Sequence, residues 1–161
     1  MDDNHKFALA HMIDTLQIGE RFTKWPLHIT LLPWFHCGDN LVETIRRIET
    51  IIVNTQPFGV SVGEDAMFGP EHDVPVMLLS KSEELTKLHA RIYHQLVISG
   101  CRLESEEYSR ANLKPHITVR GDRNIANGTR VIIDSIDLVE NLQDGKMGRK
   151  VVRRFNFSAP S

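Results

Sequence analysis

The sequence contains little cysteine and no long apolar run, and each shortage excludes a class of protein. Its two cysteines, Cys37 and Cys101, form no CxxC pair, so we predict free thiols in a reducing compartment rather than a disulfide framework. No apolar run approaches the ~20 residues of a membrane-spanning helix. The start, MDDNHKFALA, lacks the basic and apolar parts of a signal peptide. We therefore expect a cytoplasmic protein, or one that acts in a host cytoplasm if it is viral.

The sequence also lacks a large excess of charge of either sign. Its formal net charge is −2, which does not suggest a protein that coats nucleic acids in general. No low-complexity segment or long linker interrupts the 161 residues, and 41% hydrophobic content is ordinary for a globular chain. We expect residues 1–161 to form a single two-lobed domain.

Two segments have helical periodicity. In the first, at 40–57, Asn40 is a candidate N-cap with Glu43 completing a capping box, and the apolar face consists of Leu41, Ile45, Ile48 and Ile52. The second begins after the candidate N-cap Ser82 and ends before Gly100. Its apolar face consists of Leu85, Leu88, Ile92 and Leu96.

Seven other stretches have the composition of strands, at 6–13, 26–35, 58–62, 74–80, 116–119, 130–140 and 150–158. A polar loop is expected at 101–113, and QDGK at 143–146 carries the Asp-Gly signal of a hairpin turn. Each half of the chain thus mixes strands with one helix. We predict an α+β fold with two pseudo-symmetric lobes of antiparallel strands and one main helix each.

One short motif occurs twice, as PLHITLL at 26–32 and KPHITVR at 114–120. Side chains alternate between the two faces of a strand. His28 and Thr30 therefore share one face, as do His116 and Thr118, while the intervening apolar residues can anchor each strand in its lobe. We expect the two His-x-Thr faces to line a cleft between the lobes.

Two imidazoles and two hydroxyls suit phosphodiester chemistry without a metal or cofactor. One neutral histidine removes a proton from water while the other, protonated, donates to the leaving oxygen. The threonine hydroxyls can donate to the oxygens on which charge develops. A single HxT would more simply be structural; two copies in matched surroundings favour a site.

The paired motifs resemble those of the two-histidine (2H) phosphoesterase superfamily, whose members are RNA ligase-like proteins and cyclic phosphodiesterases. The resemblance implies a two-lobed α+β fold and metal-independent hydrolysis of 2′,3′-cyclic phosphate RNA ends or 2′–5′ linked oligonucleotides. It implies His28, Thr30, His116 and Thr118 as catalytic residues. RNA ends, oligonucleotides or cyclic nucleotides would be the partners of a monomeric enzyme.

Three further residues are candidates for substrate binding. Arg120 would lie on the face of His116 and could bind a phosphate through its guanidinium group. Phe35 and Tyr108 could stack on a base, although Phe35 is equally a candidate for the core. Phe68 is a further aromatic candidate.

Other functions remain open at this stage. The same chemistry could act on cyclic oligonucleotide signals of bacterial immunity. The fold could also bind RNA without turnover, or the two motifs could be structural strands of an unrelated α+β domain.

Overall fold

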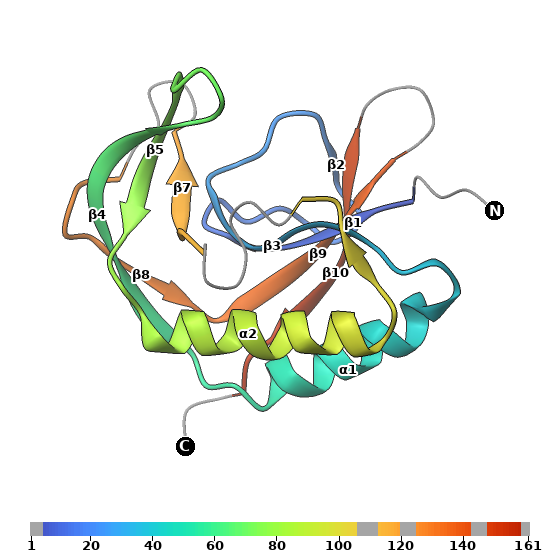
Figure 1. Cartoon of the computed structure of the whole chain (residues 1–161). Helices are drawn as coiled ribbons and strands as arrows, with labels where there is room; N and C mark the ends of the chain where they lie inside the picture. The colour runs from blue at the N-terminus through green and yellow to red at the C-terminus, as the bar shows by residue number, and fades with distance from the viewer. Residues whose placement is uncertain (1–4, 106–112, 120–124, 143–147, 159–161) are drawn as a thin grey trace.

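The computed structural model describes residues 5–105, 113–119, 125–142 and 148–158. These residues form an antiparallel sheet and two main helices (Figure 1). The strands are β1 (Phe7–Met12), β2 (Arg21–Phe22), β3 (His28–His36), β4 (Phe58–Phe68), β5 (Val74–Leu79), β6 (Arg102–Leu103), β7 (His116–Thr118), β8 (Arg130–Ile133), β9 (Ser135–Asn141) and β10 (Arg149–Asn156). The helices are η1 (Gly38–Asn40), α1 (Leu41–Val53) and α2 (Glu83–Ile98).

The described strands form one sheet in the order β2-β10-β9-β1-β3-β7-β5-β4-β8, and β6 pairs with the far end of β3. Neighbouring strands run antiparallel throughout. The two His-x-Thr strands, β3 and β7, are neighbours, so the halves of the sheet meet at the repeated motif. The predicted α+β class, with antiparallel strands and two main helices, is confirmed.

The helices lie side by side beneath the sheet (Figure 1), with α1 packed against β10 and α2 against β3. The predicted second helix is confirmed in detail: its four apolar-face residues are all buried. The Ser82 hydroxyl accepts a hydrogen bond from the Leu85 N–H at 3.1 Å, as an N-cap should. Gly100 follows the helix with φ of 81°, a backbone conformation that favours glycine.

The first helix packs as predicted and begins after Asn40 as predicted, but its N-terminus is not capped as predicted. Ile48 and Ile52 are fully buried, and Leu41 and Ile45 pack partly buried against the same core. The capping box is wrong, because the Asn40 side chain makes no capping bond. Its amide donates instead to the Ser99 carbonyl at the end of α2, at 2.8 Å.

Two of the expected strand and loop assignments are also wrong. The stretch 130–140 is two strands, separated at Asp134: β8 pairs with β4, whereas β9 pairs with β1 and β10. The chain crosses here from one half of the sheet to the other. The expected loop 101–113 contains β6, which needs β3 as a partner to form. The predicted turn at 143–146 lies outside the described residues.

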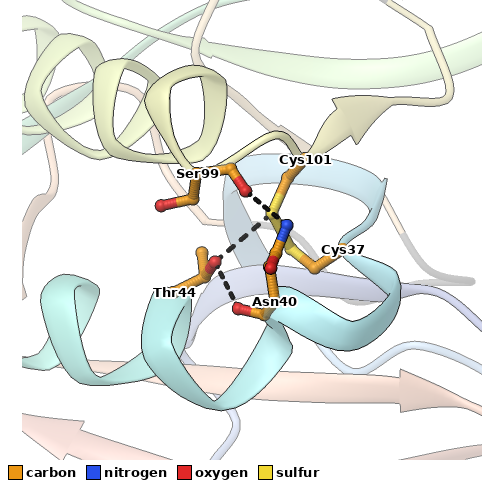
Figure 2. The surroundings of a disulfide bond; sticks show 5 residues. All are labelled: Cys37, Asn40, Thr44, Ser99 and Cys101. Carbon is orange, nitrogen blue, oxygen red and sulfur yellow. Dashed lines mark hydrogen bonds between the residues drawn. A yellow bond between two sulfur atoms is a disulfide. The ribbon is translucent and has the colours of Figure 1, made fainter.

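The two cysteines are joined, so the prediction of free thiols is wrong. Cys37 and Cys101 form a disulfide between residues 64 positions apart, with their Cα atoms 4.3 Å apart. Figure 2 shows the bond between the end of β3 and the start of β6, beside Thr44, Asn40 and Ser99. The pairing of β6 with β3 brings the cysteines together, a contact that no sequence spacing indicates. Free thiols were the basis for expecting a reducing compartment, and the disulfide removes that basis.

Among the described residues, no helix has both the length and the apolar character needed to cross a membrane.

Candidate active site

The pairing of β3 with β7 places the two motifs side by side on adjacent strands of the sheet. Ile29 is the partner of Ile117 in an antiparallel register. His28 therefore lies opposite Thr118, and Thr30 lies opposite His116. Ile29 and Ile117 belong to the core on the helix side of the sheet, so the four polar residues point to the other face. The histidines occupy diagonal positions, typically about 7–8 Å apart, a separation that can accommodate a phosphate group.

Each motif holds its histidine ring in the same way. The His28 Nδ1–H donates to the Pro26 carbonyl at 2.8 Å, and the His116 Nδ1–H donates to the Lys114 carbonyl at 2.9 Å. In both cases the acceptor belongs to the residue two positions before the histidine. A neutral imidazole that donates through Nδ1 carries its lone pair on Nε2. The same atom, Nε2, is thus the proton-exchanging nitrogen of both rings.

The surroundings of His116 favour its neutral form. Burial lowers the pKa of this imidazole below its usual 6.5, and the hydrogen bond to the Lys114 carbonyl opposes the shift only in part. Desolvation penalises a charged imidazole more than a neutral one. At neutral pH His116 is therefore suited to accept a proton.

Each histidine also contacts an aromatic ring. The Trp25 indole stacks on His28, with ring centroids 4.4 Å apart and planes 27° apart. Phe68 meets His116 edge to face, with centroids 4.7 Å apart. Sequence reasoning missed Trp25 and assigned Phe68 no contact with a histidine. The signal for Trp25 was its place three residues before His28, where Pro26 turns the chain into the strand.

A cavity of about 280 Å³ adjoins the pair on the side of Thr30 and His116. Its apolar walls consist of Leu31, Pro33, Leu113 and Pro115, and its polar lining consists of Thr30, Ser105, Lys114 and His116. Its lining residues Leu31 and Pro33 lie between the pairings of β3 with β7 and with β6, where the described residues place no strand beside β3.

The other predicted substrate residues are not part of this arrangement. Phe35 is fully buried, so the prediction that it stacks on a base is wrong. It shares the strand face of Ile29 and Leu31, and that face packs into the core. Tyr108 and Arg120 lie outside the described residues. Among the described residues, no group of three or more His, Cys, Asp or Glu side chains is placed to hold a metal ion.

Comparison with protein families matches residues 6–132 to the 2′-5′ RNA ligase superfamily. Among curated proteins, one from Bacillus mycoides (strain KBAB4), named "Putative phosphoesterase", is 32% identical over 108 residues, which cover 66% of this chain and 58% of that protein. A protein of the same name from Bacillus cereus (strain B4264) is 33% identical over 95 residues, or 58% of this chain and 51% of that protein. The chain thus spans a little over half the length of these relatives.

Solved structures of similar shape extend over nearly the whole chain. TT0787 of Thermus thermophilus matches with a TM-score of 0.68 and 14% identity, covering 97% of this chain and all of that one. Escherichia coli LigT, solved in complex with 3′-AMP, matches with a TM-score of 0.62 and 13% identity over 96% of this chain and 98% of LigT. At such low identity these likenesses establish the fold alone.

Proposed function

The chain belongs to the 2′-5′ RNA ligase superfamily, and from this premise we propose that it is a phosphodiesterase that uses His28 and His116 as acid and base. Its substrates are 2′,3′-cyclic phosphate ends of RNA or 2′–5′ linked oligonucleotides. The observation that carries the proposal is the Ile29–Ile117 pairing, which puts both histidines and both threonines on one face.

The surroundings of the two rings support an assignment of roles. Because burial lowers its pKa, His116 is the base that takes a proton from water as the water oxygen bonds to phosphorus. His28, protonated and stacked on Trp25, donates its Nε2 proton to the ribose oxygen as the P–O bond breaks. Thr30 and Thr118 donate to the non-bridging oxygens, where negative charge accumulates in the transition state. Arg120, two residues beyond Thr118, is proposed to bind a phosphate oxygen.

Two further observations are consistent with this proposal. LigT has been solved in complexes with 3′-AMP and with NADP+, so a protein of this fold accommodates nucleotides. The described residues from both halves of the sheet contribute to one hydrophobic core, which supports residues 1–161 acting as one two-lobed unit.

Turnover of defined substrates tests the proposal. Purified protein should hydrolyse nucleoside 2′,3′-cyclic phosphates or 2′–5′ dinucleotides equally well with and without EDTA. The kcat/KM profile should be bell-shaped, with its acid limb below pH 6.5 because the pKa of His116 is lowered. Replacing His28 or His116 by Ala should reduce kcat about 10²- to 10⁴-fold, whereas His94→Ala, an exposed histidine on α2, should leave it unchanged.

Other results would point to other functions. Loss of activity in EDTA, or full activity in a folded His28→Ala variant, would overturn the two-histidine mechanism. Turnover confined to cyclic di- or trinucleotides would identify the substrates as cyclic nucleotide signals. Binding of RNA without product at any pH would make the protein a binding module.

A further inference from the structure

The cavity beside the histidine pair lies in a gap of the sheet. On one edge, β3 pairs with β7 at Ile29 and with β6 at Phe35 and His36. Residues 31–33, between these pairings, have no described strand beside them on that edge, whereas the Trp34 carbonyl accepts a hydrogen bond from the Glu104 N–H at 2.9 Å. Pro33 lies in this stretch and lacks the N–H with which a residue joins a strand ladder. The Leu31 carbonyl accepts a hydrogen bond from His89 Nδ1 at 2.8 Å, so α2 supports the strand where the ladder is interrupted.

The gap is continuous with the site of the proposed reaction. Thr30 and His116 line the cavity, and both belong to the group of four polar residues on the β3–β7 face. On the opposite side, the His28 ring is covered by Trp25. A molecule whose phosphate lies between the histidines therefore has room for its bulk on the side of Thr30 and His116.

The size and lining of the cavity suit a flat ring. Leucine and proline residues line it, and its volume of about 280 Å³ is ample for a purine. Lys114 and Ser105 line it as well. A lysine ammonium has three donors and no acceptor. It therefore suits a base that presents two adjacent acceptors, as guanine does with O6 and N7.

We propose that this cavity holds the nucleobase of the nucleotide whose phosphate reacts, and that Lys114 makes guanine the preferred base. The inference rests on the proposed function for the position of the phosphate. Lys114 also contributes the backbone carbonyl that holds His116. The same residue thus reads the base with its side chain and orients the second histidine with its main chain.

Equilibrium binding tests this inference without any need for turnover. The four nucleoside 3′-monophosphates are titrated into the protein by calorimetry. Guanosine 3′-monophosphate should bind about tenfold or more tightly than the other three, since a bidentate contact to guanine discriminates by about that factor. Lys114→Met keeps the backbone carbonyl and removes the donor, so it should abolish the preference. Lys81→Met, at an exposed position before α2, should retain it.

A second variant tests occupancy of the cavity itself. Leu113→Trp should fill the cavity and weaken binding of all four nucleotides while leaving the affinity for inorganic phosphate unchanged; thermal unfolding verifies that the variant folds. Equal affinities for the four nucleotides, a preference that survives Lys114→Met, or unaltered binding by Leu113→Trp would each overturn the inference. Guanine-selective binding without hydrolysis would instead refute the proposed function and leave the cavity assignment standing.

Discussion

The two His-x-Thr motifs share the residues His-Ile-Thr, but different side chains surround their histidines. His28 lies face to face with an indole, whose contacts also include the guanidinium of Arg149 at 5.6 Å from the ring centroid. His116 meets the smaller ring of Phe68, edge to face. The indole thus covers one face of the His28 ring, whereas the Phe68 ring meets His116 at an angle of 66°. The asymmetry of the pair resides in these neighbours.

The contribution of Trp25 can be measured by two substitutions. Trp25→Leu should lower kcat about two- to fivefold, the loss expected for one such contact. Trp25→Phe retains an aromatic face and should restore most of kcat.

Trp34→Leu is the matched control for that experiment. Trp34 belongs to the same cluster, with its ring centroid 6.1 Å from that of Trp25. If Trp34→Leu lowered kcat as far as Trp25→Leu does, the effect would be one of general packing, and the role of the stack would be refuted.

At the scale of elements, α2 is docked on β3 through a buried histidine. His89 is 1% exposed, and its Nδ1–H donates to the Leu31 carbonyl at 2.8 Å. Burial lowers the pKa of His89, and the hydrogen bond opposes this only in part. Below pH 6.5 the unfolded chain therefore takes up a proton more readily than the folded one. The stability contributed by neutral His89 is complete above pH 6.5 and is lost as the pH falls toward the folded-state pKa.

His89→Asn should reduce the fall in the free energy of unfolding at acid pH, because the asparagine amide can still donate to the Leu31 carbonyl but does not titrate. Between pH 6.5 and 5.5 the wild type should lose up to about 1 kcal/mol more of its free energy of unfolding than the variant does. Urea unfolding at the two pH values measures the difference. His94→Asn, exposed on the same helix, should behave like the wild type; an equal reduction in both variants would contradict the assignment to His89.

Most elements could be predicted from the sequence, and the failures have a common cause. The 3.6-residue period of α2 and the cap at Ser82 are local properties, and both predictions are confirmed. The capping box at Asn40 and the single strand at 130–140 failed because a partner far away in the chain decided the outcome. The Asn40 side chain donates a hydrogen bond to the Ser99 carbonyl. Strand β8 pairs with β4, whereas β9 pairs with β10.

The disulfide acts on the whole molecule. It ties the end of the first motif strand to the start of β6. The Thr44 hydroxyl lies 3.4 Å from the Cys101 sulfur, and the hydrogen bond from Asn40 to Ser99 lies beside the same disulfide (Figure 2). A cross-link between residues so far apart restricts the unfolded chain strongly.

The double variant Cys37→Ser/Cys101→Ser should therefore be less stable by about 2–4 kcal/mol in free energy of unfolding. Urea unfolding with and without a dithiol reductant measures this. The reductant should lower the stability of the wild type to that of the variant and leave the variant unchanged. A reductant effect of equal size on both proteins would show that the bond does not contribute as inferred.

The sequence by itself determined the local conformations and the chemistry of the site residues. Residue types and their spacing indicated the helices, most of the strands and the paired His-x-Thr motifs. Strand alternation puts Phe35 on the face of Ile29, away from His28, a signal that the prediction of base stacking did not use. Only the tertiary structure decided which strands are neighbours, because register between distant segments depends on packing and not on local propensity. That pairing set His28 opposite Thr118, joined Cys37 to Cys101, and left open beside Pro33 the gap in which we place the base.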